Sequence, residues 1–174
     1  MKKMFMVVMV ALLGISFMGI SSAIAGDCPK GDGTGTPGYW KNKSDLDDWD
    51  GTEALVLWCG ESRDTAVPFS QSDVLQILNS PVKGDKWITI FKAWAAAVLN
   101  VEVNDNCAPV CDYPGGGDIN LITVNDWLCD NLGEKKVRAN SDEWQYSHGE
   151  AQYWCLDDYN NGLHEGIPSR DDLE

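Results

Sequence analysis

Carboxylates cluster in the stretch DLDDWDGTE, residues 45–53, and clustered carboxylates are the ligands that hard cations such as Ca²⁺ select. An EF-hand loop needs acids at positions 1, 3 and 5, glycine at position 6 and glutamate at position 12. With Gly51 at position 6, leucines occupy positions 1 and 12, so the stretch is not an EF-hand. A calcium site of another kind and a solvated acidic loop both remain open. The candidate calcium ligands are Asp45, Asp47, Asp48, Asp50 and Glu53.

Six cysteines offer either disulfide bonds or a metal site. An even number of cysteines in an exported chain is typical of disulfides, and six cysteines allow fifteen pairings. Zinc is the alternative, because Cys107, Cys111, His148 and His164 are residues of the types that bind it. No C-x-x-C pair occurs, however, and the two histidines are sixteen residues apart, so the spacing favours disulfides. The cysteines are Cys28, Cys59, Cys107, Cys111, Cys129 and Cys155.

The common catalytic motifs do not occur in the sequence, which contains no G-x-S-x-G, H-E-x-x-H or P-loop string. Residues 33–38, GTGTPG, match the pattern of dinucleotide sites, but no apolar strand precedes them and Pro37 lacks an N–H group for a phosphate. A triad can assemble from distant residues, which keeps a small secreted hydrolase as an alternative with His148 as its candidate base. The spacing of His148 favours a hydrogen-bonded core histidine instead. We therefore assign no catalytic residue.

Eight tryptophans provide a second kind of binding chemistry, because indole rings stack on sugar rings as well as filling cores. Trp49 and Tyr113 lie among acids or near glycines in expected loops and are the candidates for a sugar-binding surface. Tyr39 and Trp40 have two interpretations, as an aromatic staple on the core or as part of a ligand or partner site. Five further tryptophans recur at helical spacing, which predicts that they fill the core. They are Trp87, Trp94, Trp127, Trp144 and Trp154.

The N-terminus has the three parts of a secretory signal peptide. Lys2 and Lys3 precede an uncharged run, residues 4–20, and SSAIA then offers a cleavage site after Ala25. We therefore expect residues 1–25 to be removed and the protein to be exported, to the periplasm or out of the cell. The net charge of −14 becomes more negative when the two lysines are lost, which disfavours nucleic acid and, after cleavage, membrane partners. It favours solubility, cation binding or basic partners.

Hydrophobic periodicity predicts four helices that position these side chains. The second helix has the widest apolar stripe, so we expect it to be central. Residues 55–58 fit either a short strand or a helical turn. The predicted helices are 70–80 with Ser70 or Ser72 as N-cap, 85–100, 123–133 with Thr123 or Asn125 as N-cap, and 141–162.

These elements predict a mainly α fold, a small disulfide-stabilised helical bundle with long irregular loops. The helical module spans residues 43–163, and residues 104–118 form its longest loop, which we expect to be cross-linked. An irregular leader with the aromatic staple, residues 26–42, precedes the module, and a polar tail, residues 164–174, follows it.

Five strings, taken in order, resemble a module of secreted and surface bacterial proteins that opens with T-P-G-Y/F-W-K-N-H and closes on L-x-x-Y-N-x-G. The resemblance implies an exported bacterial protein with a mainly helical module, and the family has no established activity. The chain departs from the pattern at Lys43, where histidine is usual. The strings are TPGYWKNK (36–43), VLQILNSPVKGD (74–85), AAAVLN (95–100), DWL (126–128) and LDDYNNGL (156–163).

The leading functional hypothesis is an exported non-enzymatic module that is structural or binds a protein or surface partner, with calcium as a candidate cofactor. A carbohydrate-binding protein that uses loop aromatics is the first alternative, with a glycan as its partner. A small secreted hydrolase is the second alternative.

The staple hypothesis makes the first prediction. Pro37 and Gly38 suit a type II turn that would place Tyr39 and Trp40 on the helices. Under this hypothesis, Trp40→Ala lowers the free energy of unfolding by about 3 to 5 kcal/mol, because a large buried ring is lost. A thermal or denaturant melt measures the loss, and an unchanged melt would contradict the staple.

Overall fold

The computed structural model describes residues 33–43, 45, 47–113, 117–133 and 136–164. The predicted signal peptide, residues 1–25, lies outside this part, as do Cys28 and the start of the predicted leader. The predicted tail also lies outside it, apart from its first residue, His164. None of the helices described is long and apolar enough to cross a bilayer.

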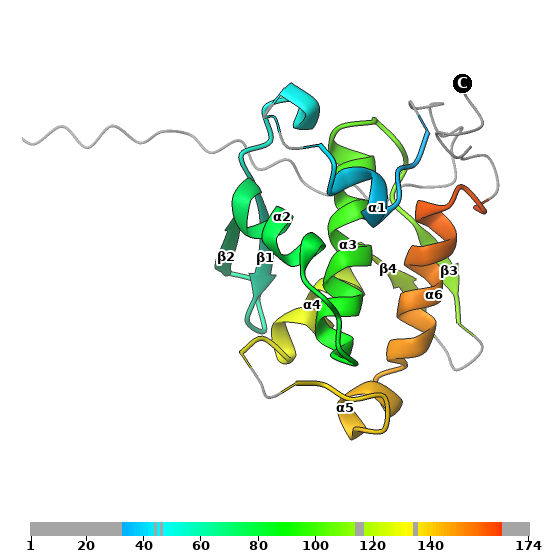
Figure 1. Ribbon diagram of the computed structural model, residues 1–174. Helices are drawn as coiled ribbons and strands as arrows, with labels where there is room; N and C mark the ends of the chain where they lie inside the picture. Colours follow the sequence, from blue (N-terminus) through cyan, green and yellow to red (C-terminus); the bar gives the residue numbers. More distant parts are fainter. Residues whose placement is uncertain (1–32, 44, 46, 114–116, 134–135, 165–174) are drawn as a thin grey trace, which may run out of the picture.

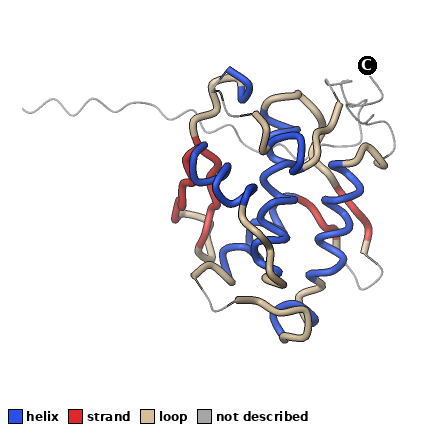
Figure 2. The backbone as a smooth tube through the Cα atoms, in the orientation of Figure 1, coloured by secondary structure: helices blue, strands red, loops and turns tan. Residues whose placement is uncertain are grey.

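The fold is mixed α/β, which corrects the prediction of a mainly α bundle. Helix accounts for 47% and strand for 15% of the described structure, and the strands form two small antiparallel sheets. The elements in chain order are α1 (Pro37–Trp40), the 3-10 turn η1 (Asp47–Trp49), β1 (Ala54–Cys59), β2 (Thr65–Ser70), α2 (Gln71–Asn79), α3 (Lys86–Glu102), β3 (Val110–Asp112), β4 (Asp118–Asn120), α4 (Leu121–Asp130), α5 (Asp142–Gln145) and α6 (Gly149–Asn160). Figures 1 and 2 show α3 at the centre, with the two sheets on opposite sides of it.

Capping side chains determine where the long helices begin. Ser70, one of the two predicted N-caps, forms a capping box at the start of α2, and the carboxylate of Asp85 caps α3, which begins close to its predicted start. The cap of α4 is Asn120 rather than Thr123 or Asn125, so this helix begins earlier than predicted. The carboxamide oxygen of Asn120 accepts from two backbone N–H groups of the first turn, which satisfies donors that the helix itself leaves unpaired.

The β1–β2 hairpin shows that residues 55–58 are a strand rather than a helical turn. Alternate side chains of β1 are buried, as expected for a strand with one face on the core. On α4, the carboxamide of Asn125 accepts from the Trp58 N–H at 2.9 Å and donates to the Trp58 carbonyl oxygen at 2.7 Å. The Cys59–Cys129 disulfide joins the same two elements. The strand therefore depends on partners that lie far away in the sequence.

The second hairpin consists of β3 and β4 and occupies most of the stretch 104–118 that was predicted to be an irregular loop. It ends two residues beyond that stretch, at Asn120. Strands β3 and β4 are antiparallel, and Cys111 lies opposite Ile119. A disulfide from Cys111 to Cys155 ties β3 to α6, and Cys107 is also disulfide-bonded, so the predicted cross-linking of this loop is confirmed. Strands of three residues are too short for periodicity to reveal them.

The predicted fourth helix, 141–162, is in fact two helices, α5 and α6. At the break, His148 has a φ of 57°, in the left-handed region that redirects the chain. The indole of Trp144 packs directly against Gly149, where an added Cβ would lie 2.3 Å from the ring. A close packing contact therefore lies at the break, and local sequence periodicity does not reveal it.

The leader forms a short helix instead of the predicted type II turn. Pro37 is the first residue of α1, where its missing N–H costs nothing, and Thr36 caps the helix through its hydroxyl oxygen. Helix α1 lies against α3 and buries Trp40, which is 1% exposed.

A buried hydrogen-bond network joins this leader to the centre of the fold. Asn100 Oδ1 accepts from the Gly35 N–H at 2.7 Å and from the Trp40 indole N–H at 2.9 Å. Asn100 Nδ2 donates to the Gly35 carbonyl oxygen at 3.0 Å and to Asn160 Oδ1 at 2.9 Å. Asn160 in turn donates to the Ala93 carbonyl oxygen at 2.9 Å. One carboxamide on α3 thus holds α1 and α6 together.

We expect Asn100→Ala to lower the free energy of unfolding by at least about 3 kcal/mol. Each buried polar group that loses its hydrogen-bond partner costs about 1 to 3 kcal/mol, and this substitution removes the partner of several such groups. Urea titration followed by circular dichroism measures this loss. Asn161→Ala is the control, since that exposed carboxamide bonds only a carbonyl of its own helix, and its effect should stay within about 0.5 kcal/mol. Equal losses in the two variants would contradict the importance of the network.

Candidate functional site

A hollow of about 450 Å³ opens beside the break between α5 and α6. Its size falls in the range of small-molecule sites. Aromatic rings line much of it, and it also contains a carboxylate and an amide. Its aromatic and polar lining side chains are Tyr113, Trp144, Gln145, His148, Glu150 and Trp154.

Two rings in close contact, tilted toward each other, line one part of the hollow. The centroids of Tyr113 and His148 are 4.4 Å apart, with an interplanar angle of 39°. Tyr113 directly follows β3, and the Cys111–Cys155 disulfide holds that strand to α6. His148 precedes α6, and its side chain is exposed. The hairpin and the helix break therefore bring together two rings that are distant in the sequence.

Two indoles complete the aromatic lining. Trp144 is buried and meets Trp127 edge-on, with ring centroids 6.0 Å apart. Trp154 projects from α6 and is 52% exposed, which makes it the most accessible indole of the hollow. Tyr153 meets the Trp154 ring at 63°, with centroids 5.4 Å apart.

The hydroxyl of Tyr153 donates a hydrogen bond to Asp157 Oδ1 at 3.2 Å, one helical turn further on. Burial, and then the negative charge of Asp157, raises the pKa of Tyr153. The phenol therefore keeps its proton at neutral pH and remains a donor to Asp157. This bond restrains the ring that packs against Trp154.

Glu150 is the charged group of the hollow. Its Oε2 lies 3.7 Å from Lys86 Nζ, and the same ammonium lies 4.3 Å from the centroid of the Trp144 ring. The ion pair is largely solvated, so it contributes little to stability, but it places a cation and an anion beside the aromatic lining. The Gln145 amide can both donate and accept hydrogen bonds, while the Glu150 carboxylate accepts them.

Of the four aromatic residues predicted as ligand contacts, only Tyr113 lies in this hollow. Trp49 is 0% exposed, and its indole N–H donates to a backbone carbonyl oxygen at 2.9 Å. Trp40 belongs to the buried network described above, and the partly buried ring of Tyr39 packs edge-on against it. The predictions that Trp49 is exposed and that Trp154 is in the core are therefore both wrong.

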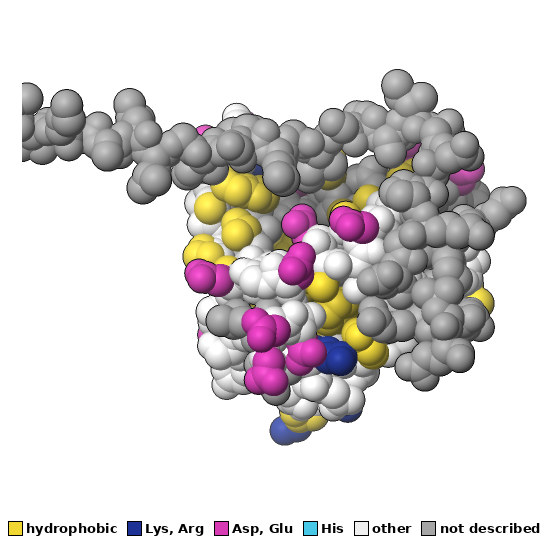
Figure 3. Space-filling view, turned by 90° about the horizontal axis from the view of Figure 1, so that it is seen from above, with side chains coloured by type: hydrophobic (Ala, Val, Ile, Leu, Met, Phe, Trp, Pro, Cys, Tyr) yellow, Lys and Arg dark blue, Asp and Glu magenta, His cyan; other side chains and the backbone are white. Residues whose placement is uncertain are grey.

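The acidic loop does not gather its carboxylates around one point. Asp48 pairs with Lys43, with 3.5 Å between nitrogen and oxygen. Within the described ranges, no three of the five predicted ligands lie close enough to share one cation. Acidic side chains are likewise spread over the described part of the face drawn in Figure 3. The exposed neighbours of Asp48 are Asp45, Asp47, Asp50 and Glu53.

One other group of side chains has the composition of a metal site. The ligand atoms of Cys111, Cys155 and His164 all lie within 4.8 Å of one another. The two sulfurs form a disulfide in this structure. The zinc set considered from the sequence does not assemble, because Cys107 is disulfide-bonded and His148 belongs to the aromatic hollow.

Sequence reasoning missed Trp154, Gln145 and Glu150 as site residues and interpreted His148 mainly as a core residue. One available signal was the adjacent pair Tyr153 and Trp154. Consecutive residues of a helix point about 100° apart, so two neighbouring large aromatics on a narrow apolar face seldom both point straight into the core.

The structure is thus a disulfide-bonded α/β fold with an open hollow lined by aromatic rings. Comparisons with protein-family models, curated proteins and solved structures found no match for this chain. The resemblance to the secreted bacterial module therefore stays a prediction, and the function has to be argued from the hollow itself.

The close contact between Trp144 and Gly149 leads to a prediction about stability, because Trp144 lines the hollow. We expect Gly149→Ala to destabilise the protein by about 1 to 3 kcal/mol, because the new methyl group would displace a buried indole. A denaturant melt followed by tryptophan fluorescence measures both the stability and the change around Trp144. Gly38→Ala is the control, since its nearest contact is at an ordinary 3.4 Å, and a similar response in both variants would argue against this packing.

Proposed function

We propose that the protein is an exported, non-enzymatic binding module that takes a sugar ring in the hollow lined by the Tyr113–His148 ring pair and the exposed indole of Trp154. The observation that carries the proposal is the 52% exposure of Trp154 next to an aromatic wall and two polar side chains. Contact of half of an indole ring with water is unfavourable in free energy. A ligand that covers the ring would remove this unfavourable contact.

The chemistry of a sugar ring matches these groups. One face of a pyranose presents C–H groups, which pack on the face of an aromatic ring, while its edge carries hydroxyls. Gln145 can donate to and accept from those hydroxyls, and Glu150 can accept from them. An open hollow of about 450 Å³ accommodates one ring or the end of a chain of rings.

The surroundings of His148 favour binding over hydrolysis. A general base needs a hydrogen bond to its nucleophile or to the proton that it removes. Among the described residues, no hydrogen bond joins the His148 side chain to a hydroxyl, thiol or carboxylate. Its ring instead packs on Tyr113, which suits a contact surface.

The predicted signal peptide and the cysteine chemistry support export. Disulfides form and persist in oxidising compartments, and the described cysteines, Cys59, Cys107, Cys111, Cys129 and Cys155, are all disulfide-bonded. A soluble module outside the cytoplasm meets glycans as free oligosaccharides and as cell-surface polymers.

The test is ligand-observed NMR by saturation transfer, with a panel of neutral methyl glycosides of glucose, galactose, mannose and N-acetylglucosamine. We expect saturation of the ring C–H protons of at least one glycoside. Trp154→Ala should weaken its binding at least about fivefold, equivalent to roughly 1 kcal/mol of stacking.

Trp58→Ala is the matched control, because Trp58 is similarly exposed, at 47%, on strand β1 and does not line the hollow. Tetramethylammonium serves as a second probe, since aromatic rings beside a carboxylate can also bind a cation. No transfer to any glycoside, an equal loss in both tryptophan variants, or saturation of tetramethylammonium alone would each overturn the sugar proposal.

A further inference from the structure

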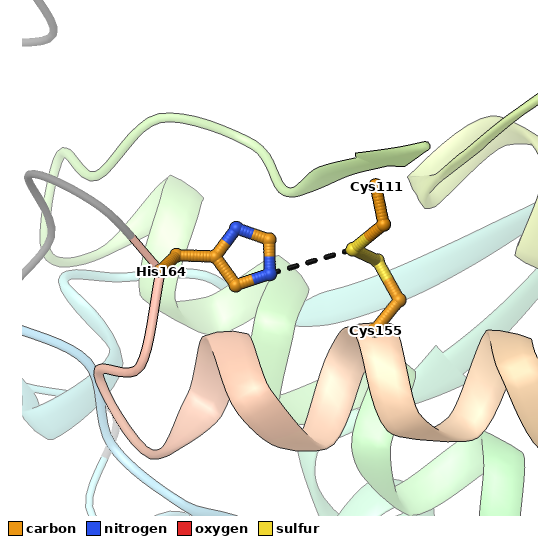
Figure 4. A group of neighbouring side chains, drawn as sticks. All are labelled: Cys111, Cys155 and His164. Atoms are coloured by element: carbon orange, nitrogen blue, oxygen red, sulfur yellow. Dashed lines mark hydrogen bonds between the residues drawn. A yellow bond between two sulfur atoms is a disulfide. The ribbon is translucent and has the colours of Figure 1, made fainter. Parts of the chain in front are cut away.

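An imidazole lies against a disulfide beside α6. Figure 4 shows Cys111 of β3 joined to Cys155 of α6, with the ring of His164 directed at them from the segment that follows the helix. His164 Nε2 lies 3.4 Å from Cys111 Sγ. Two sulfurs and an imidazole nitrogen form a ligand set typical of zinc.

We propose that, in the dithiol state, Cys111, Cys155 and His164 bind one Zn²⁺ ion, which then replaces the disulfide as the link between β3 and α6. This site differs from the aromatic hollow and does not depend on sugar binding.

The spacing of the ligands suits tetrahedral zinc. With Zn–S bonds of about 2.3 Å and Zn–N bonds of about 2.0 Å, neighbouring ligand atoms are about 3.5 to 3.8 Å apart. The separation of 3.4 Å between His164 Nε2 and Cys111 Sγ already approaches this value. The sulfurs have to move apart once their bond is broken. Rotation of the two cysteine side chains can provide this movement across a Cα–Cα distance of 6.0 Å.

The surroundings hold the imidazole in place. The ring of His164 meets the buried ring of Tyr159 edge-on, with centroids 5.7 Å apart at 87°. Tyr159 follows Cys155 by one helical turn, so both belong to the same buried face of α6. Cys155 is buried, whereas Cys111 and His164 are partly exposed, which leaves one side open for a water molecule as fourth ligand.

Conversion of the Cys111–Cys155 disulfide into the zinc-bound dithiol takes two steps, and each step balances in atoms and electrons. A thiolate of an external dithiol attacks one sulfur of the Cys111–Cys155 bond, and the other sulfur leaves as a thiolate. The second thiol of the reductant then displaces the first cysteine, so the dithiol is oxidised to its cyclic disulfide and the protein gains two thiols. Zinc binding releases the two thiol protons and forms two Zn–S bonds. In a newly exported chain whose disulfide has not yet formed, only the zinc step is needed.

The charge of the site stays the same when zinc binds. Reduction of the disulfide yields two neutral thiols, and Zn²⁺ takes the place of the two protons that they release, so the zinc-bound group is also neutral. Zinc binding therefore adds no net charge to a chain that already carries −14.

The test uses the purified chain, reduced with a phosphine and titrated with Co²⁺, whose visible absorption reports tetrahedral thiolate coordination. Alkylation and mass spectrometry first establish that Cys111 and Cys155 are free thiols. We expect one Co²⁺ per chain, displacement of Co²⁺ by Zn²⁺, and no such absorption from the oxidised chain. His164→Ala should weaken Zn²⁺ binding at least about tenfold.

Two variants serve as controls. His148→Ala changes the other histidine of the chain and should leave the Co²⁺ spectrum unchanged. The double variant Cys59→Ser/Cys129→Ser removes the second described disulfide and should retain the absorption. No tetrahedral absorption from the reduced chain, equal effects of the two histidine variants, or loss of the absorption in the double variant would overturn the proposal.

Discussion

The carboxamide of Asn100 is the constraint on which the arrangement of this fold depends. It lies on the central helix α3 with no exposed surface and uses its oxygen and its nitrogen for two hydrogen bonds each. A buried amide is costly unless every group is paired, and pairing this one requires both the leader and α6 in fixed positions. Asn104 and Asn106 extend the same principle, since both donate to the Gly33 carbonyl oxygen. Polar groups thus specify how the leader, α3 and α6 meet, while apolar side chains fill the space between them.

The parts of the fold that could be predicted are those determined by neighbours in the sequence. Ser70 and Asp85 mark helix starts because a capping side chain acts within three residues, and the apolar stripe of α3 identifies the central helix. The two hairpins could not be predicted, because they depend on distant partners such as the pairing of Asn125 with Trp58 and the two disulfides. Short strands have little periodicity of their own, so tertiary contacts determine whether they form. Most of the helical tryptophans were placed correctly as buried or partly buried, namely Trp87, Trp94, Trp127 and Trp144.

The candidate site was only partly predictable because the break between α5 and α6 at His148 changes which side chains face the core. Periodicity carried through residues 141–162 places Trp154 on the same face as Trp144, but the left-handed conformation at His148 resets the helix. After the break, Cys155 and Tyr159 face the core, and Trp154 faces outward. The interruption coincides with the close contact of Trp144 with Gly149, which a sequence pattern does not contain. Tyr113 was predicted as a contact because it lies among glycines, a local feature that needed no tertiary information.

The Cys111–Cys155 disulfide connects the two sites that the structure suggests. It fixes β3 to α6, and Tyr113, directly after β3, and Trp154, on α6, both line the aromatic hollow. Binding a rigid ligand is more favourable when the contacting rings are already in position, because less conformational entropy is lost on association. Breaking the disulfide would free the hairpin and raise that entropic cost, whereas a zinc ion held by the same sulfurs and His164 would restore the constraint. If both proposals hold, the cross-link would couple the redox state of the chain to the order of the proposed sugar-binding hollow, although the hollow and the zinc site share no residue.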